Sequence, residues 1–136
     1  MRRLLMILIT ILTSLTVIAQ PSSHECDSIY EFAEEMPVYQ NGMNGLIKYL
    51  KSDLIPILVD CNGRDGILTS SLYLSLTIDR QGKVIDVEFQ RIQATEQCKK
   101  ELREKLLTMK GWTSGMQDGI AICCTFSWPI SGINWR

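Results

Sequence analysis

The feature that most constrains the fold is a change in the spacing of apolar residues along the chain. Apolar residues recur at every second position at 72, 74, 76 and 78, and again at 85, 87 and 89. From Cys98 to Met109 the spacing changes to four, four and three, and between 122 and 128 it returns to two. Period two is typical of a half-buried strand, and the longer period is typical of an amphipathic helix. The pattern therefore predicts strand, strand, helix, strand.

A further helix is expected ahead of the first strand. Leu46, Ile47, Leu50 and Leu54 form one apolar stripe, and we expect the helix to end before Pro56 because a proline disfavours helical geometry at the residue preceding it. Residues 60–66 (DCNGRDG) are expected to be a loop.

The elements predict an α+β fold of order α-β-β-α-β: a three-stranded antiparallel sheet whose first strand is central, with the helices packed on one face. Trp112 is expected to pack into the core at the end of the second helix. The other expected core residues are Leu72, Leu74, Leu76, Ile85, Val87, Phe89, Leu102, Leu106, Ile122 and Phe126.

The amino-terminal end carries the pattern of a secretory signal peptide. Arg2 and Arg3 precede an uncharged, mostly apolar run at 4–18, and Val17 and Ala19 occupy the minus-three and minus-one positions of a cleavage site. The run is shorter than the roughly 20 residues of a membrane-spanning helix. We therefore expect a signal peptide at 1–19, a flexible lead-in at 20–35, and a folded domain at 36–136 that is periplasmic or secreted. The alternative is an inner-membrane protein anchored by residues 4–18, the one case in which we expect membrane contact.

The inventory of charged and catalytic side chains excludes several functions. Fourteen Lys and Arg against fifteen Asp and Glu give a net charge of −1, which argues against nucleic-acid binding. The single histidine, His24, lies in the lead-in beside Glu25, where a solvated polar tail is the expected role. No Gly-x-Ser-x-Gly elbow and no glycine-rich phosphate loop occur. We therefore expect no enzymatic activity, no catalytic residues, no metal site and no cofactor.

The five cysteines all follow the cleavage site, and an exported chain meets conditions in which disulfides persist. The odd number leaves at least one free thiol or an intermolecular bridge. Cys98 lies on an apolar stripe and is expected to be buried. Cys123 and Cys124 are adjacent in a strand, so their side chains face opposite ways; we expect Cys124 to be buried and Cys123 exposed. The candidate disulfide is Cys26–Cys61, which would tie the lead-in to the domain.

Several short motifs resemble the carboxy-terminal domain of TonB, in the short stand-alone form found in the Gram-negative envelope. The resemblance covers Ala33 to about Ile133, although Gly111 and Ser114 occupy positions where the family usually has prolines. The motifs that carry it are Met36-Pro37 with Tyr39, Gly42-Met43 with Leu46, Tyr49-Leu50 with Pro56, Gly63-Arg64, Thr77-Ile78-Asp79 with Gly82-Lys83-Val84, Asp86-Val87, Met109, Trp112, Gly115, Gly119 and Trp128-Pro129-Ile130.

This resemblance implies a non-catalytic periplasmic binding module linked to TonB-dependent transmembrane transport. Such a domain takes up an extended segment of an outer-membrane receptor beside its last strand, by β-augmentation. Here that strand carries no charge and no proline before Pro129, as expected of an edge kept open for a partner. The alternatives are an edge covered by the carboxy-terminal tail, and a structural or inhibitory envelope domain that forms a homodimer through this edge or a free cysteine. The candidate partner-binding residues are Ala121, Ile122, Cys123, Cys124, Thr125, Phe126 and Ser127.

The signal-peptide pattern leads to a direct test by intact mass. We expect the protein recovered from the periplasm to begin at Gln20, because the basic start, the short apolar run and the Ala19-Gln20 junction coincide. Recovery of the full-length chain in the membrane fraction would contradict cleavage and favour the anchored form.

Overall fold

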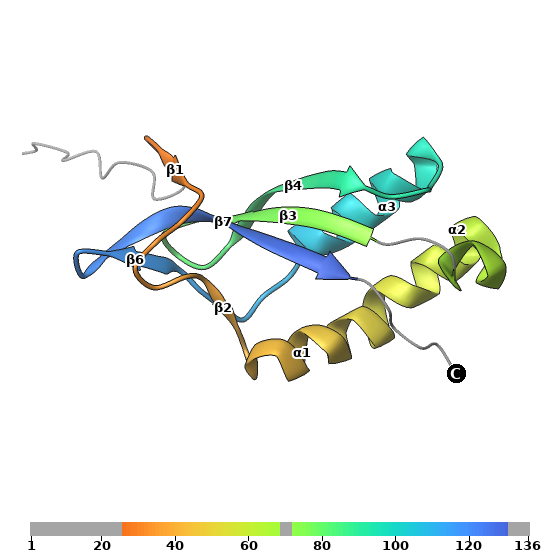
Figure 1. Ribbon diagram of the computed structural model, residues 1–136, viewed down its shortest axis with the longest axis horizontal. Helices are drawn as coiled ribbons and strands as arrows, with labels where there is room; N and C mark the ends of the chain where they lie inside the picture. The colour runs from red at the N-terminus through yellow and green to blue at the C-terminus, as the bar shows by residue number, and fades with distance from the viewer. Residues whose placement is uncertain (1–25, 69–71, 131–136) are drawn as a thin grey trace, which may run out of the picture.

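The computed structural model describes residues 26–68 and 72–130, with side chains described outside 62–68 (Figure 1). The predicted signal peptide at 1–19, the alternative anchor at 4–18 and His24 lie outside the described residues. No helix in the described part is long and apolar enough to cross a membrane. The elements, in chain order, are β1 (Ile29–Tyr30), β2 (Val38–Tyr39), α1 (Gly42–Tyr49), η1 (Leu50–Leu54), α2 (Ile55–Leu68), β3 (Leu72–Ile78), β4 (Val84–Arg91), α3 (Glu96–Leu107), β5 (Trp112–Thr113), β6 (Gly115–Gln117) and β7 (Ile120–Ile130).

The main sheet has five strands in the order β1-β7-β3-β4, with β6 also paired to β7, and β2 and β5 form a small second sheet. β3 pairs antiparallel with both β4 and β7, whereas β1 pairs parallel with β7. The α+β class and the central position of β3 are confirmed. The three-stranded antiparallel sheet is wrong as a complete description, because the sheet is mixed and larger. The strands missed, β1 and β6, have two and three residues, too few for a period-two pattern to be recognised.

The first helix continues through Pro56, which corrects the expectation that it ends there and that residues 60–66 form a loop. α1, η1 and α2 follow one another without interruption (Figure 1). In η1 the Ile55 N–H donates to the Leu50 carbonyl five residues back, so this turn is wider than an α-helical turn. A proline in a helix clashes with the carbonyl four residues before it, and the wide turn directly ahead of Pro56 relieves that clash.

The wide turn also keeps a row of leucines on one side of the long helix that α1, η1 and α2 form together. Leu46, Leu50, Leu54 and Leu58 are four residues apart and all are buried, whereas Ile47 is exposed. Four residues of a regular α-helix rotate about 40° beyond a full turn, so a long row at this spacing drifts around the axis. One π-helical turn compensates for part of this drift, and the row stays in the core.

The long helix and α3 pack against the same core and are joined by polar contacts at its rim. Lys105 of α3 pairs with Asp53 across 2.7 Å, and its carbonyl accepts a hydrogen bond from the Tyr49 hydroxyl at 3.2 Å. The hydrogen bonds from Lys105 and Ser52 lower the pKa of the Asp53 carboxyl. Burial raises the pKa of the Tyr49 hydroxyl well above its usual value, so it remains a donor at neutral pH.

A β-bulge in β4 shifts which residues enter the core. Ile78 pairs with Val84 and Thr77 pairs with Asp86, so Ile85 is an extra residue without an opposite partner. Val84 is therefore buried, whereas Ile85, expected in the core, is only half-buried.

The other core expectations are confirmed in most positions. Trp112 is buried, 5.2 Å from Tyr39 and 4.9 Å from Phe126 between ring centroids. Phe89 and Phe126 are partly buried and pack against the core. The expected core residues that are buried are Leu72, Leu74, Leu76, Val87, Leu102, Leu106 and Ile122.

The bulge can be tested by placing a threonine at either of two neighbouring positions. Val84→Thr buries a hydroxyl at a site that is 1% exposed, and we expect it to lower the free energy of unfolding by about 1–3 kcal/mol. Ile85→Thr places the hydroxyl at a half-buried site, and we expect a loss below about 1 kcal/mol. Chemical denaturation measures both values. The reverse order would mean that Ile85 lies in the core and that the bulge is absent.

Candidate functional site: the outer edge of strand β7

Strand β7 begins in a tight hairpin that sets the direction of its backbone groups. Asp118 and Gly119 connect β6 to β7, and both have positive φ (51° and 73°), as in a type I′ turn. Gln117 and Ile120 flank this two-residue turn and are paired. In such a hairpin the flanking residues exchange hydrogen bonds, and the direction then alternates along the strand. The backbone groups of even-numbered residues of β7 therefore face β6, and those of odd-numbered residues face away.

Pro129, at the other end of β7, independently indicates that the backbone groups of odd-numbered residues face the outer edge. It lies opposite Tyr73 in the ladder with β3, yet it has no N–H to donate. Proline is accepted within a sheet where its nitrogen faces an open edge. Residues two and four positions earlier share this direction, so the N–H and C=O groups of Thr125 and Ser127 also face away from β3.

The outer edge of β7 is partly occupied by β1. Ile29 pairs with Cys123 and Tyr30 with Cys124, on the side opposite β3. The chain then leaves this edge, because Glu35 forms two backbone hydrogen bonds with Met116 of β6, at 2.9 and 3.1 Å. Within residues 26–68 and 72–130, no strand pairs with the outer edge at 125–127.

The candidate partner-binding residues therefore fall into three groups. Ala121 and Ile122 lie in the hairpin with β6, and Cys123 and Cys124 pair with β1. Thr125, Phe126 and Ser127 pair with β3 alone. Phe126 faces the core beside Trp112, and the parallel pairing of Tyr30 with Cys124 uses the Thr125 N–H. The groups available to a partner are therefore mainly the Thr125 C=O and the Ser127 N–H and C=O.

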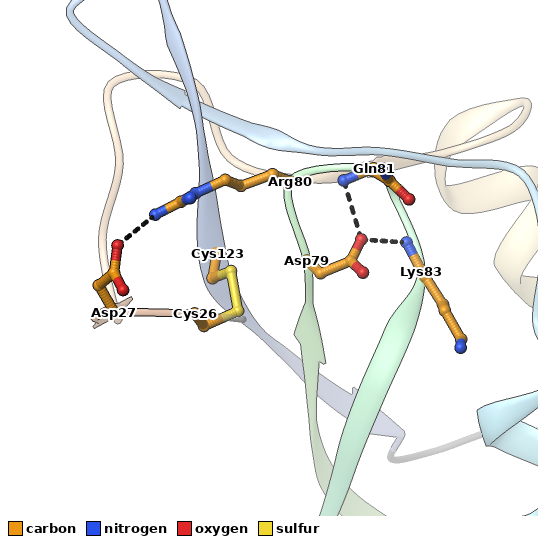
Figure 2. The surroundings of a disulfide bond; sticks show 7 residues. All are labelled: Cys26, Asp27, Asp79, Arg80, Gln81, Lys83 and Cys123. Atoms are coloured by element: carbon orange, nitrogen blue, oxygen red, sulfur yellow. Dashed lines mark hydrogen bonds and ion pairs between the residues drawn. A yellow bond between two sulfur atoms is a disulfide. The ribbon is translucent and has the colours of Figure 1, made fainter. Parts of the chain in front are cut away.

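A disulfide joins Cys26 to Cys123, and the candidate Cys26–Cys61 bridge is wrong (Figure 2). The bonded residues are 97 positions apart, and their Cα atoms are 6.0 Å apart. Cys123 is buried and not exposed as expected, because the segment from Cys26 covers it. No local sequence signal predicts this pairing, since it depends on β1 lying along β7.

Cys124 faces the opposite side of β7 from its neighbour, as predicted. It is buried, and its sulfur lies 4.0 Å from the sulfur of Met36. Burial raises the pKa of the Cys124 thiol, which keeps it in the neutral form.

Residues 26–35 are thus part of the fold, which corrects the flexible lead-in expected there and the domain boundary at residue 36. Besides the disulfide, Asp27 pairs with Arg80 across 3.3 Å (Figure 2). The Glu34 N–H donates to Gln117 Oε1 at 3.1 Å, and Gln117 Nε2 donates back to Glu34 Oε1 at 3.1 Å. The Asp27–Arg80 pair is exposed and contributes little, so the disulfide is the principal attachment.

The turn that carries Arg80 is itself rigid. The buried carboxylate of Asp79 accepts hydrogen bonds from the backbone N–H groups of Gln81 (2.8 Å) and Lys83 (2.9 Å), as Figure 2 shows. Gly82 has a φ of +78°, and a Cβ at this position would overlap the Trp112 carbonyl oxygen. The turn therefore requires glycine there, and it holds Arg80 beside the amino-terminal segment.

The free edge presents backbone groups and small uncharged side chains. The side chains of Thr125 and Ser127 lie opposite Thr77 and Ser75 on one face of the sheet, and the residues that form this edge are uncharged. The described residues hold no group of three or more His, Cys, Asp or Glu that could bind a metal ion. Comparison with protein-family models, curated proteins and solved structures finds no match to this chain.

The role of the disulfide can be tested in a Cys61→Ser background, where Cys26–Cys123 is the bond that responds to reductant. Closing a loop of 97 residues stabilises a fold by on the order of 3–4 kcal/mol. We expect reductant to lower the melting temperature of Cys61→Ser by at least about 10 °C. Adding Cys26→Ser should abolish that response. A double variant as sensitive to reductant as Cys61→Ser would contradict the pairing.

Proposed function

We propose that this domain binds an extended segment of a protein partner, which adds as a strand to the outer edge of β7 beyond β1. The observation that carries the proposal is the outer edge at 125–127, where no described strand pairs and where the Thr125 C=O and the Ser127 N–H and C=O face outward. An edge strand usually carries a lysine, a bulge or a covering element that prevents pairing with another chain. Residues 125–127 carry no charge, which favours an edge used for binding.

The pairing of β1 with β7 supports the same function. A two-residue segment already adds to this edge in parallel orientation at Cys123 and Cys124, so the backbone of β7 is shaped to accept an added strand there. Because the chain leaves after Tyr30, a partner segment would begin where β1 ends and continue along Thr125 and Ser127.

The compartment and the partner class follow from the cysteines and the resemblance described above. The Cys26–Cys123 disulfide is consistent with an oxidising compartment, as expected for a periplasmic or secreted chain. The motifs shared with TonB carboxy-terminal domains favour a segment of a TonB-dependent outer-membrane receptor as the partner.

The same uncharged edge also favours a second candidate, a homodimer in which two β7 edges pair. A thiol-linked dimer is a narrower case. Among the free cysteines of the described residues, Cys98 and Cys124 are buried and Cys61 is partly exposed, so such a dimer would have to use Cys61.

The test is affinity capture from detergent-solubilised envelope with the parent, Ser127→Lys and Asn44→Lys. A lysine on an edge discourages strand addition, and loss of one or two hydrogen bonds of about 1 kcal/mol each weakens binding about 5- to 30-fold. We expect the parent and Asn44→Lys to capture an outer-membrane receptor and Ser127→Lys to lose it. Asn44 is exposed on α1 and controls for the added charge.

Circular dichroism checks that each variant is folded, and size-exclusion chromatography follows the second candidate. Equal capture by Ser127→Lys and the parent would place the interface elsewhere. A parent dimer that Ser127→Lys converts to a monomer would identify a second copy as the occupant of the edge.

A further inference from the structure

The long helix and α3 bring two free thiols to the same part of the core. Cys61 of α2 is partly exposed, and Cys98 in the first turn of α3 is fully buried. Cys61 packs against the core cluster that contains Cys98, and burial, together with the proximity of Cys61, raises the pKa of the Cys98 thiol. The Cys61 sulfur also lies 3.9 Å from Oε2 of Glu101, which is three residues after Cys98 and on the same face of α3. Cys61 and Cys98 therefore lie at the same part of the contact between α2 and α3.

The remaining cysteines are not available to this pair. Cys26 and Cys123 are bonded to each other, and Cys124 of β7 is buried against Met36. Cys61 and Cys98 are thus the two free thiols that can pair with each other. Cys124 is the fifth cysteine and remains a buried thiol.

We propose that Cys61 and Cys98 are a site of disulfide formation, at which a disulfide oxidant such as oxidised glutathione closes a second covalent bridge between α2 and α3. The proposal concerns the helices and is independent of the proposed binding at β7.

The accessible surface of Cys61 determines the order of the steps. The Cys61 thiolate attacks one sulfur of the oxidant, forms a mixed disulfide and releases the first glutathione thiolate. Cys98 then loses its proton to solvent and attacks the Cys61 sulfur, which breaks the mixed disulfide and releases the second glutathione. The protein loses two electrons and two protons, and one glutathione disulfide becomes two thiols.

The second step is expected to be slower than the first. Burial, together with the nearby Cys61, raises the pKa of the Cys98 thiol to about 12, so little thiolate is present at neutral pH. A mixed disulfide on Cys61 should therefore appear before the bridge closes.

The experiment reduces the purified protein, exposes it to a glutathione-disulfide buffer, quenches samples over time and alkylates the remaining thiols after denaturation. Non-reducing peptide mapping should recover Cys61 linked to Cys98 and Cys26 linked to Cys123, with alkylated Cys124. Early samples should carry glutathione on Cys61. Recovery of both Cys61 and Cys98 as alkylated thiols, when Cys26–Cys123 has already formed, would overturn the proposal.

Two variants separate bridge formation from loss of a thiol. Cys98→Ser should keep glutathione on Cys61, because the thiol that would displace it is absent. Cys61→Ser replaces the partly exposed residue, so the fold does not depend on tolerance of a buried serine. We expect oxidation to raise the melting temperature of the parent by at least about 5 °C more than that of Cys61→Ser. Equal shifts in the parent and Cys61→Ser would also overturn the proposal.

Discussion

The alternation of backbone direction along β7 is the constraint on which the rest of the structure depends. Each residue of a strand directs its N–H and C=O to one side, and its neighbour directs them to the other. Over eleven residues, β7 therefore has two separate edges. The even-numbered residues complete the sheet with β6 and β3, whereas the odd-numbered residues receive β1 at Cys123 and at the Thr125 N–H, and beyond these groups no described strand pairs with the outer edge at Ser127. Pro129 ends the usable part of the outer edge, because it has no N–H.

Side chains alternate in step with the backbone, which separates the residues of the core from those of the outer edge. Phe126 and Trp128 face the core and belong to even positions, whose backbone groups are already used by β3. Thr125 and Ser127 direct their side chains to the other face and their backbone groups to the outer edge. A substitution at Ser127 therefore changes the edge without opening a cavity in the core, whereas shortening Phe126 affects packing.

The sequence predicted the elements whose pattern repeats several times, and it missed those set by one local geometry or by tertiary contacts. β3, α3 and the apolar face of β7 each contain three or more apolar repeats. The continuation of the helix past Pro56 depends on one wide turn, and the burial of Val84 in place of Ile85 depends on one bulge. β1 and the Cys26–Cys123 bond depend on contact between distant segments, which no local periodicity encodes. The sequence indicated the candidate edge, but not β1, which pairs with part of it.

The length of the free edge limits how a partner can bind. The outer edge offers three backbone groups beyond β1, the Thr125 C=O and the Ser127 N–H and C=O, because the parallel pairing of Tyr30 with Cys124 uses the Thr125 N–H. Three hydrogen bonds of about 1 kcal/mol each give about 3 kcal/mol, which corresponds to a Kd above about 1 mM. Tighter binding therefore requires side-chain contacts beside the edge. Tyr73 lies opposite Pro129 on the same face as Ser127 and is exposed, and Ile29 on β1 is exposed at the other end. Because Cys26–Cys123 fixes β1 in place, Ile29 is held at a constant distance from the edge. A partner that is extended over the edge and apolar near its ends would use both contacts.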